Sequence, residues 1–156
     1  TKRAGELLFD GSPATILRTN FFGPSRVVQR TTLSDWITSS LTAGSKIPVF
    51  TDVLFSPLTM CSLSQIIVQL LHDPPIGVFN VGSREGMTKA DFAFAVAKSL
   101  DLREDLLVPA LSASGLPNRA RRPKDMRMNV SAIENVLGRQ MPLLSDEIKS
   151  LRATRG

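Results

Sequence analysis

Four basic residues crowd into one short stretch near the end of the chain, and their types and spacing suggest phosphate chemistry. The stretch reads NRARRPKD, and its cations are Arg119, Arg121, Arg122 and Lys124. A guanidinium group can bond two phosphate oxygens at once, so the cluster predicts a site for one or two phosphates. The alternative is a solvated basic loop, but four neighbouring cations repel one another unless an anion lies among them.

The formal net charge of +5 over 156 residues fits nucleic acid, an anionic membrane or a phosphorylated small molecule as partner. Nucleic-acid surfaces usually interleave basic and aromatic residues, whereas this chain has no tyrosine and its eight phenylalanines follow apolar patterns. Its apolar runs are also too short for a membrane helix. We therefore expect a small phosphorylated ligand, and neither a nucleic-acid nor a membrane partner.

The chain has one cysteine, Cys61, and one histidine, His72. Zinc sites need several such ligands close together, so we expect no metal site. The apolar helical pattern before the sequence DPP predicts that His72 is an ordinary residue at a helix end. A lone cysteine cannot form an internal disulfide, which favours a reduced, cytoplasmic setting.

Short strands alternating with helices must position these residues, and this order predicts an α/β fold with some parallel pairing. Apolar, β-branched runs predict strands at 14–19, 46–51 and 76–82. Pro48 places the second of these at a sheet edge because proline cannot donate a ladder hydrogen bond. Gly82, in NVGSREG, predicts a turn between strand and helix. The alternative, a phosphate-binding turn, has little support because the chain lacks a GxGxxG fingerprint and a P-loop.

Helices are predicted from apolar spacing and from capping residues. One helix spans Leu33, Trp36, Ile37 and Leu41 and stops at Gly44, and the clearest contains Leu63, Ile66, Ile67, Leu70 and Leu71. A third begins at Thr88 with Asp91 in a capping box, and a fourth is capped by Ser131 with Glu134 and stops at Gly138. Residues 144–155 form a last helix or a frayed tail.

Several pieces occur together in an order that resembles a known family. TKxxGE, ILRTNFFGP, VFTDxxFSPLT, GVFNVGS with MTKADFAFAVAKSL, and RARRPKDMRMNVSAIENVLG follow one another over nearly the whole chain. This succession resembles the C-terminal half of extended short-chain dehydrogenase/reductases, especially the dTDP-4-dehydrorhamnose reductase branch, with nucleotide-sugar epimerase/dehydratases next. The resemblance implies the end of a Rossmann-type NAD(P)-binding sheet plus a small α/β substrate-binding domain.

The resemblance implies that Lys2 is the catalytic lysine of a Y-x-x-x-K motif whose tyrosine precedes residue 1. Residues four apart share a helix face, so this lysine lowers the pKa of the tyrosine and also binds ribose hydroxyls of the cofactor, NAD(P)H. From position alone, a solvated lysine at the end of a helix is the favoured interpretation of Lys2; the flanking TKxxGE sequence and the downstream motif order favour the catalytic lysine.

Three further residues carry over from the same resemblance. Thr19 would line the nicotinamide side, Asn20 would contact the nucleotide sugar, and Arg122 would face the substrate diphosphate, with Arg119 and Arg121 as helpers. The alternative for Asn20 is a residue that serves a turn before Gly-Pro. An arginine typical of epimerases is absent near FSPLT (Phe55 to Thr59), which favours the reductase branch.

We expect residues 1–30 to end the Rossmann-like domain. Residues 31–156 would form mostly the substrate-binding domain, with a returning strand and helix near 76–100. The parent protein would be an NAD(P)-dependent nucleotide-sugar oxidoreductase, most like a dTDP-4-keto-sugar reductase. The alternatives are an epimerase/dehydratase or a non-catalytic regulatory subunit of the same fold. The expected partners are a nucleotide sugar, the N-terminal half of the same protein and, as an open alternative, a second copy of the protein.

Overall fold

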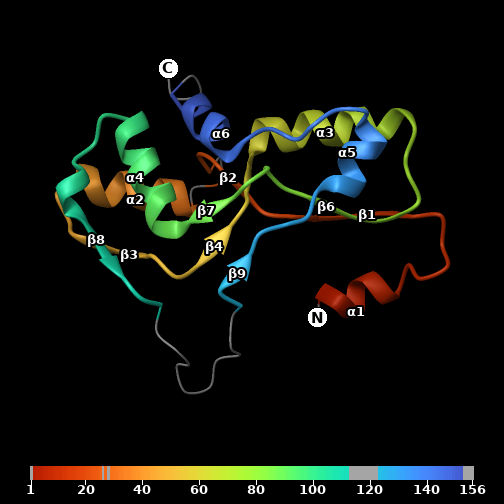
Figure 1. The fold of residues 1–156 in the computed structure, drawn as a ribbon, viewed down its shortest axis with the longest axis horizontal. Coiled ribbons are helices and arrows are strands. Elements are labelled where there is room, and N and C mark those ends of the chain that lie inside the picture. The colour runs from red at the N-terminus through yellow and green to blue at the C-terminus, as the bar shows by residue number, and fades with distance from the viewer. Residues whose placement is uncertain (1, 26, 28, 113–122, 153–156) are drawn as a thin grey trace.

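The structure is a computed structural model that describes residues 2–25, 27, 29–112 and 123–152. It has mixed α/β architecture, as the sequence predicts (Figure 1). The helices are α1 (Lys2–Leu7), α2 (Leu33–Thr42), α3 (Met60–His72), α4 (Lys89–Ser99), α5 (Ser131–Leu137) and α6 (Leu144–Ser150). The strands are β1 (Thr15–Thr19), β2 (Phe21–Phe22), β3 (Ile47–Phe50), β4 (Leu54–Phe55), β5 (Leu58–Thr59), β6 (Gly77–Val81), β7 (Met87–Thr88), β8 (Leu107–Ala110) and β9 (Asp125–Met126).

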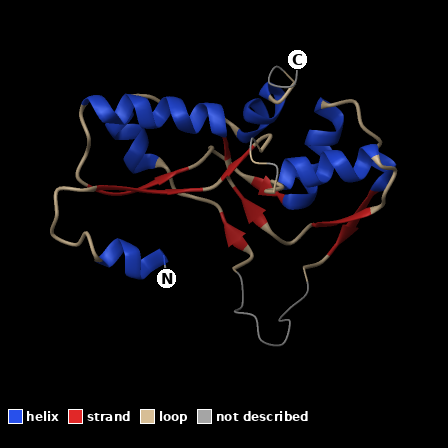
Figure 2. Cartoon of the chain, turned by 180° about the vertical axis from the view of Figure 1, so that it is seen from behind, coloured by secondary structure: helices blue, strands red, loops and turns tan. Residues whose placement is uncertain are grey.

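Parallel pairing joins strands that are far apart in the sequence. β1 pairs with β6, β2 with β5, and β3 with β8, all in parallel. β4 lies between β7 and β9 in a three-stranded sheet. Figure 2 shows α3 and α5 on one face of the β1–β6 pair and α1 on the other.

Two apolar clusters form the core. One contains Phe92, whose ring meets Phe22 and Phe55 edge to face at centroid distances of 5.0 and 5.1 Å. It joins α2, α4, α6 and β3. The other surrounds Leu58 and Ile133 and joins α3, α5 and β6. The predicted division at residue 30 stays a prediction.

The capping predicted for α5 is wrong. The helix begins at Ser131, but its N-cap is Val130, and no side chain caps it. Ser131 therefore lies one position inside the helix, where its own amide donates to the side chain of Asn129 at 3.0 Å. Glu134 accepts from the amide of Met141 at 2.7 Å, so it ties down the segment that follows the helix.

α3 buries a narrower face than its apolar spacing predicts. Leu63, Ile66 and Leu70 are buried, whereas Ile67 is 39% exposed and Leu71 is 71% exposed. The helix covers β6 and α5 with one row of side chains, and the next row faces outward. The helix ends at His72, as expected.

Close backbone approach explains Gly82. A Cβ at this position would lie 2.6 Å from the carbonyl oxygen of Ser56, and the amide of the next residue, Ser83, donates to that same oxygen at 3.0 Å. Only glycine allows the strand end to approach the β4–β5 segment so closely. This packing role accounts for the residue without a bound phosphate.

Candidate functional site

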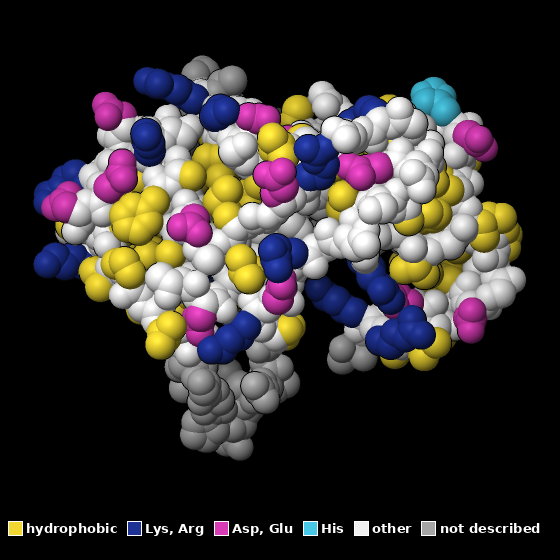
Figure 3. Space-filling view, viewed as in Figure 1, with side chains coloured by type: hydrophobic (Ala, Val, Ile, Leu, Met, Phe, Trp, Pro, Cys, Tyr) yellow, Lys and Arg dark blue, Asp and Glu magenta, His cyan; other side chains and the backbone are white. Residues whose placement is uncertain are grey.

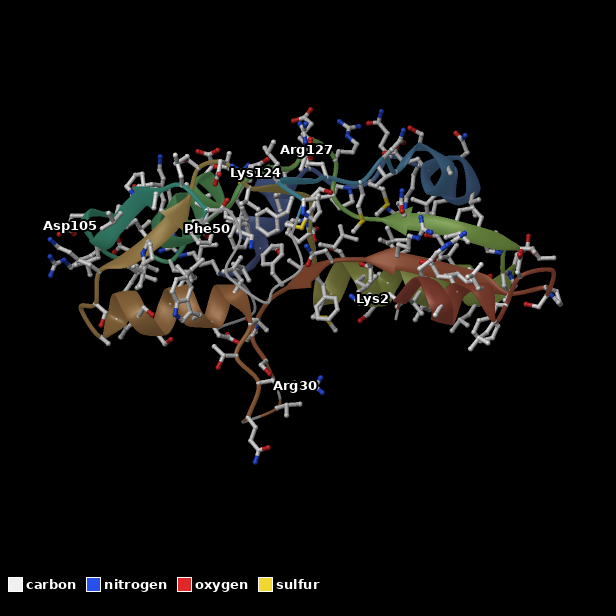
Figure 4. All side chains as sticks on the ribbon, turned by 90° about the horizontal axis from the view of Figure 1, so that it is seen from below. Lys2, Arg30, Phe50, Asp105, Lys124 and Arg127 are labelled. Atoms are coloured by element: carbon white, nitrogen blue, oxygen red, sulfur yellow. The ribbon has the colours of Figure 1, made fainter. Side chains whose placement is uncertain are left out.

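Lys2 lies in the first turn of α1, with its side chain exposed. α1 and β1 run in opposite directions, so the start of α1 faces the carboxyl end of β1 (Figures 1 and 4). The segment 8–14 makes the reversal, with Ser12 donating through its amide and its hydroxyl to the carbonyl of Phe9. Lys2 thus lies near the strand end that carries Thr19 and Asn20.

Glu6 links α1 to β1 through Arg18. The guanidinium donates from Nε and Nη2 to the two carboxylate oxygens at 2.7 and 2.6 Å, and Arg3 adds a bond of 3.1 Å. Hydrogen bonding to Arg18 lowers the pKa of Glu6 to about 2, and the carboxylate in turn raises the pKa of Arg18. No local sequence pattern predicts this pair, because Glu6 and Arg18 are twelve residues apart and meet only after the chain reverses direction.

Thr19 is the last residue of β1 and Asn20 follows it, at the strand end where open parallel sheets commonly bind ligands. The hydroxyl of Thr19 is buried and has no hydrogen-bond partner within the described residues. Such an orphaned group at a strand end suits a ligand polar atom. The carbonyl of Asn20 accepts a hydrogen bond from the amide of Leu58 at 3.0 Å. This bond lies directly before the β2–β5 pair, which continues the chain after β1.

The loop after Asn20 is fixed on the start of α2. Gly23, at φ +127°, donates its amide to Ser34 at 3.1 Å, and its carbonyl accepts from Thr32 at 2.8 Å. The amide of Ser25 donates to Asp35 at 2.9 Å. The residues that cap α2 therefore also hold the segment that follows Asn20.

Arg119, Arg121 and Arg122 lie outside the described residues, so their predicted site stays a prediction. Asp52 bonds both flanks of this segment. It accepts from the amide and hydroxyl of Ser112 at 2.8 and 2.9 Å and from Lys124 Nζ at 2.6 Å. The bond from Lys124 is the main cause that lowers the pKa of Asp52 to about 2. Lys124 thus has an internal anion, which lessens the repulsion inferred from the sequence.

Two shallow hollows lie among the described residues, and neither of these two is lined by Thr19 or Asn20. One of about 330 Å³ lies between α1 and the β1–β6 pair and includes Arg3, Glu6 and Ile16. Figure 3 shows Lys and Arg side chains gathered around this recess. The other, of about 370 Å³, is lined by Ser56, Ser83, Glu85, Gly86, Asp125, Arg127, Met128 and Asn129.

The described part of the chain also bears on metal binding, thiol chemistry and membrane insertion. No group of three or more His, Cys, Asp or Glu side chains there could hold a metal ion. Cys61 is free and exposed. None of the described helices is long and apolar enough to cross a membrane.

A parallel strand pair flanked by helices, with polar residues at one strand end, defines an α/β protein. A family model described as "RmlD substrate binding domain" matches residues 1–154, so the chain belongs to this family. The resemblance read from the sequence is therefore confirmed.

Individual relatives agree with this family. The chain is 30% identical over 118 residues to the probable low-salt glycan biosynthesis reductase Agl14 of Haloferax volcanii. The aligned region covers 76% of this chain and 39% of that protein. It is similar in structure to a dTDP-4-dehydrorhamnose reductase from Bacillus anthracis, solved in complex with NADP. That match has a TM-score of 0.84 and 19% identity, and covers 99% of this chain and 54% of the other.

A third relative is the Bordetella bronchiseptica enzyme WbmG, solved in complex with NAD. The TM-score is 0.75 at 26% identity, and the match covers 97% of this chain and 47% of that enzyme. The chain therefore spans about half the length of these solved relatives and less of the curated reductase.

Proposed function

We propose that this chain is the substrate-binding portion of an NAD(P)-dependent nucleotide-sugar reductase, most like one that reduces a dTDP-4-keto sugar. The observation that carries the proposal is the family match over residues 1–154, combined with the placement of Lys2 toward the carboxyl end of β1. The names of the relatives support a reductase, since Agl14 and the B. anthracis protein both carry that description.

In this proposal Lys2 holds a positive charge beside a tyrosine one helical turn earlier, outside this chain. The charge favours the ionised phenol and so lowers its pKa toward the working pH, which lets it give and take a proton. Lys2 also binds ribose hydroxyls of the cofactor. The nicotinamide cofactor, when bound, supplies the hydride.

The residues at the end of β1 fit a ligand of this kind. Thr19 has a buried hydroxyl without a partner among the described residues, so a carboxamide on the nicotinamide side would satisfy it. Asn20 would orient the sugar nucleotide. Arg122, with Arg119 and Arg121, would bind the diphosphate through paired hydrogen bonds.

The test is NADPH and NADH oxidation by the full-length protein, followed with dTDP-4-keto-6-deoxy sugars and with UDP-linked 4-keto sugars. We expect oxidation only in the presence of a 4-keto nucleotide sugar. Lys2→Met should lower kcat at least a hundredfold, since the charge beside the acid is lost. Absence of turnover with every 4-keto sugar tried would count against the reductase.

Two alternatives have their own signatures. A shared fold does not imply a shared activity, so a non-catalytic subunit of the same fold is one alternative. Such a subunit would bind NAD(P)H or a nucleotide sugar without consuming either. An epimerase would interconvert two nucleotide sugars without net oxidation of the cofactor. A dehydratase would release water from the sugar, also without net oxidation of the cofactor.

A further inference from the structure

Apolar packing does little to hold α1 in place within the described structure. None of its residues is buried. Leu7, at its end, is 54% exposed, and Leu8 and Phe9, which follow, are 83% and 54% exposed. Within the described residues, polar contacts therefore set the orientation of this helix.

The contact that sets it is the fork between Glu6 and Arg18. Both carboxylate oxygens accept from the same guanidinium, at 2.7 and 2.6 Å, and a two-bond fork fixes direction as well as distance. The Glu6 side chain is only 15% exposed, whereas that of Arg18 is 46% exposed. The carboxylate is therefore enclosed between helix and strand.

The positions of the two residues connect this fork with the candidate site. Lys2 and Glu6 are four residues apart, so they share one face of α1. Arg18 immediately precedes Thr19 on β1. The fork thus joins the face of α1 that carries Lys2 to the residue next to the strand end.

We propose that Glu6 and Arg18 are positioning residues that fix the rotation of α1 and so aim Lys2 at the carboxyl end of β1. This inference rests on the proposed role of Lys2. Neither residue needs to touch substrate or cofactor. Their effect on catalysis passes through the placement of the lysine charge.

The test compares Glu6→Gln and Arg18→Lys in the full-length protein, with the same coupled reductase assay. Glutamine keeps the shape but loses the charge, and lysine keeps the charge but loses the fork. We expect each to lower kcat about tenfold or more, since small misplacements of a catalytic group are costly, with the KM for the sugar within about threefold.

The pH profile supplies a readout that a purely structural pair would not move. If Lys2 no longer sits beside the tyrosine, the pKa of that phenol rises. Ketone reduction needs the protonated phenol, so kcat falls as the phenol ionises at alkaline pH. This alkaline limb of the pH profile of kcat should move to higher pH in both variants. The reversed pair, Glu6→Arg with Arg18→Glu, should restore a large part of kcat and return the limb toward its original place.

Asp105→Asn is the matched control. Arg103 and Asp105 also form a two-bond fork, with Nε and Nη2 donating at 3.1 and 2.6 Å, but on an exposed turn next to β8. This variant should stay within about twofold of the parent in kcat, with an unchanged pH limb.

The outcomes separate the two proposals. If Lys2→Met keeps full activity, the proposed function of Lys2 is wrong. If Lys2→Met is inactive while Glu6→Gln and Arg18→Lys lower only Tm and leave kcat and the alkaline limb unchanged, the positioning role is wrong and the fork is merely structural.

Discussion

Asp52 is the residue whose charge matters most to the architecture around the arginine-rich segment. Its carboxylate bonds Ser112 on one side of that segment and Lys124 on the other. An aspartate from the β3–β4 turn thus joins both flanks of the segment, while the phosphate site predicted from the sequence stays a prediction. The sequence offered no sign of this, because Asp52 lies far from both partners along the chain.

Asp52→Asn should make stability less dependent on acid pH. The folded protein holds the pKa of Asp52 at about 2, below its usual value of 3.8. The stabilisation is therefore fully present above pH 3.8 and is lost as the pH falls through about 2. We expect the variant to have a lower Tm than the parent at pH 6, and the difference to disappear near pH 2.

Thermal melts at several pH values measure this effect. Asp146→Asn is the control, because Asp146 forms an exposed pair with Lys149 three residues later, and such pairs contribute little. A Tm difference for Asp52→Asn that stays constant from pH 6 to pH 2 would show that the ion pair is not its source.

At the scale of elements, Glu147 of α6 caps the start of α3. Its carboxylate accepts from the amide and hydroxyl of Thr59 at 2.6 and 2.8 Å and from the hydroxyl of Ser62 at 2.7 Å. Glu147 is only 5% exposed. A buried anion at a helix N-terminus satisfies free donors and also interacts favourably with the helix dipole. Helix α6 thus holds α3 in place by polar bonds.

Glu147→Ala should destabilise the protein by about 2–4 kcal/mol, because it leaves buried donors without partners. Glu147→Gln should cost less, since an amide oxygen still accepts. Chemical denaturation followed by circular dichroism measures both changes. The neighbouring variant Asp146→Ala, at an exposed position, should change stability by less than about 0.5 kcal/mol. Equal losses for Glu147→Ala and Asp146→Ala would contradict the capping role.

Local signals predicted some elements well. Thr88 caps α4 by accepting from the amide of Asp91 at 3.0 Å, as the Thr-Lys-Ala-Asp sequence predicts. Gly44 follows the end of α2 at φ +72°, where a left-handed conformation suits glycine. β3 forms at Ile47–Phe50, and its only partner among the described strands is β8, in agreement with an edge position for Pro48. These features depend on residues close together in the sequence.

Tertiary features could not be predicted in this way. β4, β7 and β9 are two residues long, which is too short for any periodicity to appear. The capping of α5 was wrong because the helix starts one residue away from the position that the Ser131–Glu134 spacing requires. The partners of Glu147 lie on a distant segment, so no local pattern marks them. For the site, Lys2, Thr19 and Asn20 came from the family resemblance, and their roles stay predictions.

For the whole molecule, the important surface surrounds the β1–β6 pair. Within the described residues β1 pairs with β6 alone, so its other edge lacks a strand. Leu8, Ile76 and Val78 nearby are 83%, 70% and 45% exposed. Open edges and clustered apolar side chains favour association with another chain segment. The N-terminal half expected from the resemblance would cover this region.

Isolated residues 1–156 should therefore self-associate. Size-exclusion chromatography with light scattering at rising concentration should show an increase in mean mass. Ile76→Lys should reduce the association, whereas Val136→Lys, on the outer side of α5 at 43% exposure, should not. A monomer at all concentrations with one cooperative melt would refute this expectation.

The parallel β1–β6 ladder also has a consequence for the order of folding. Thr15 pairs with Gly77, so β1 cannot find its partner until more than sixty further residues have been made. At ordinary translation speeds the wait is roughly 3–12 s. During synthesis β1 therefore leaves the ribosome long before β6, and its edges stay available to chaperones or to earlier parts of the nascent chain.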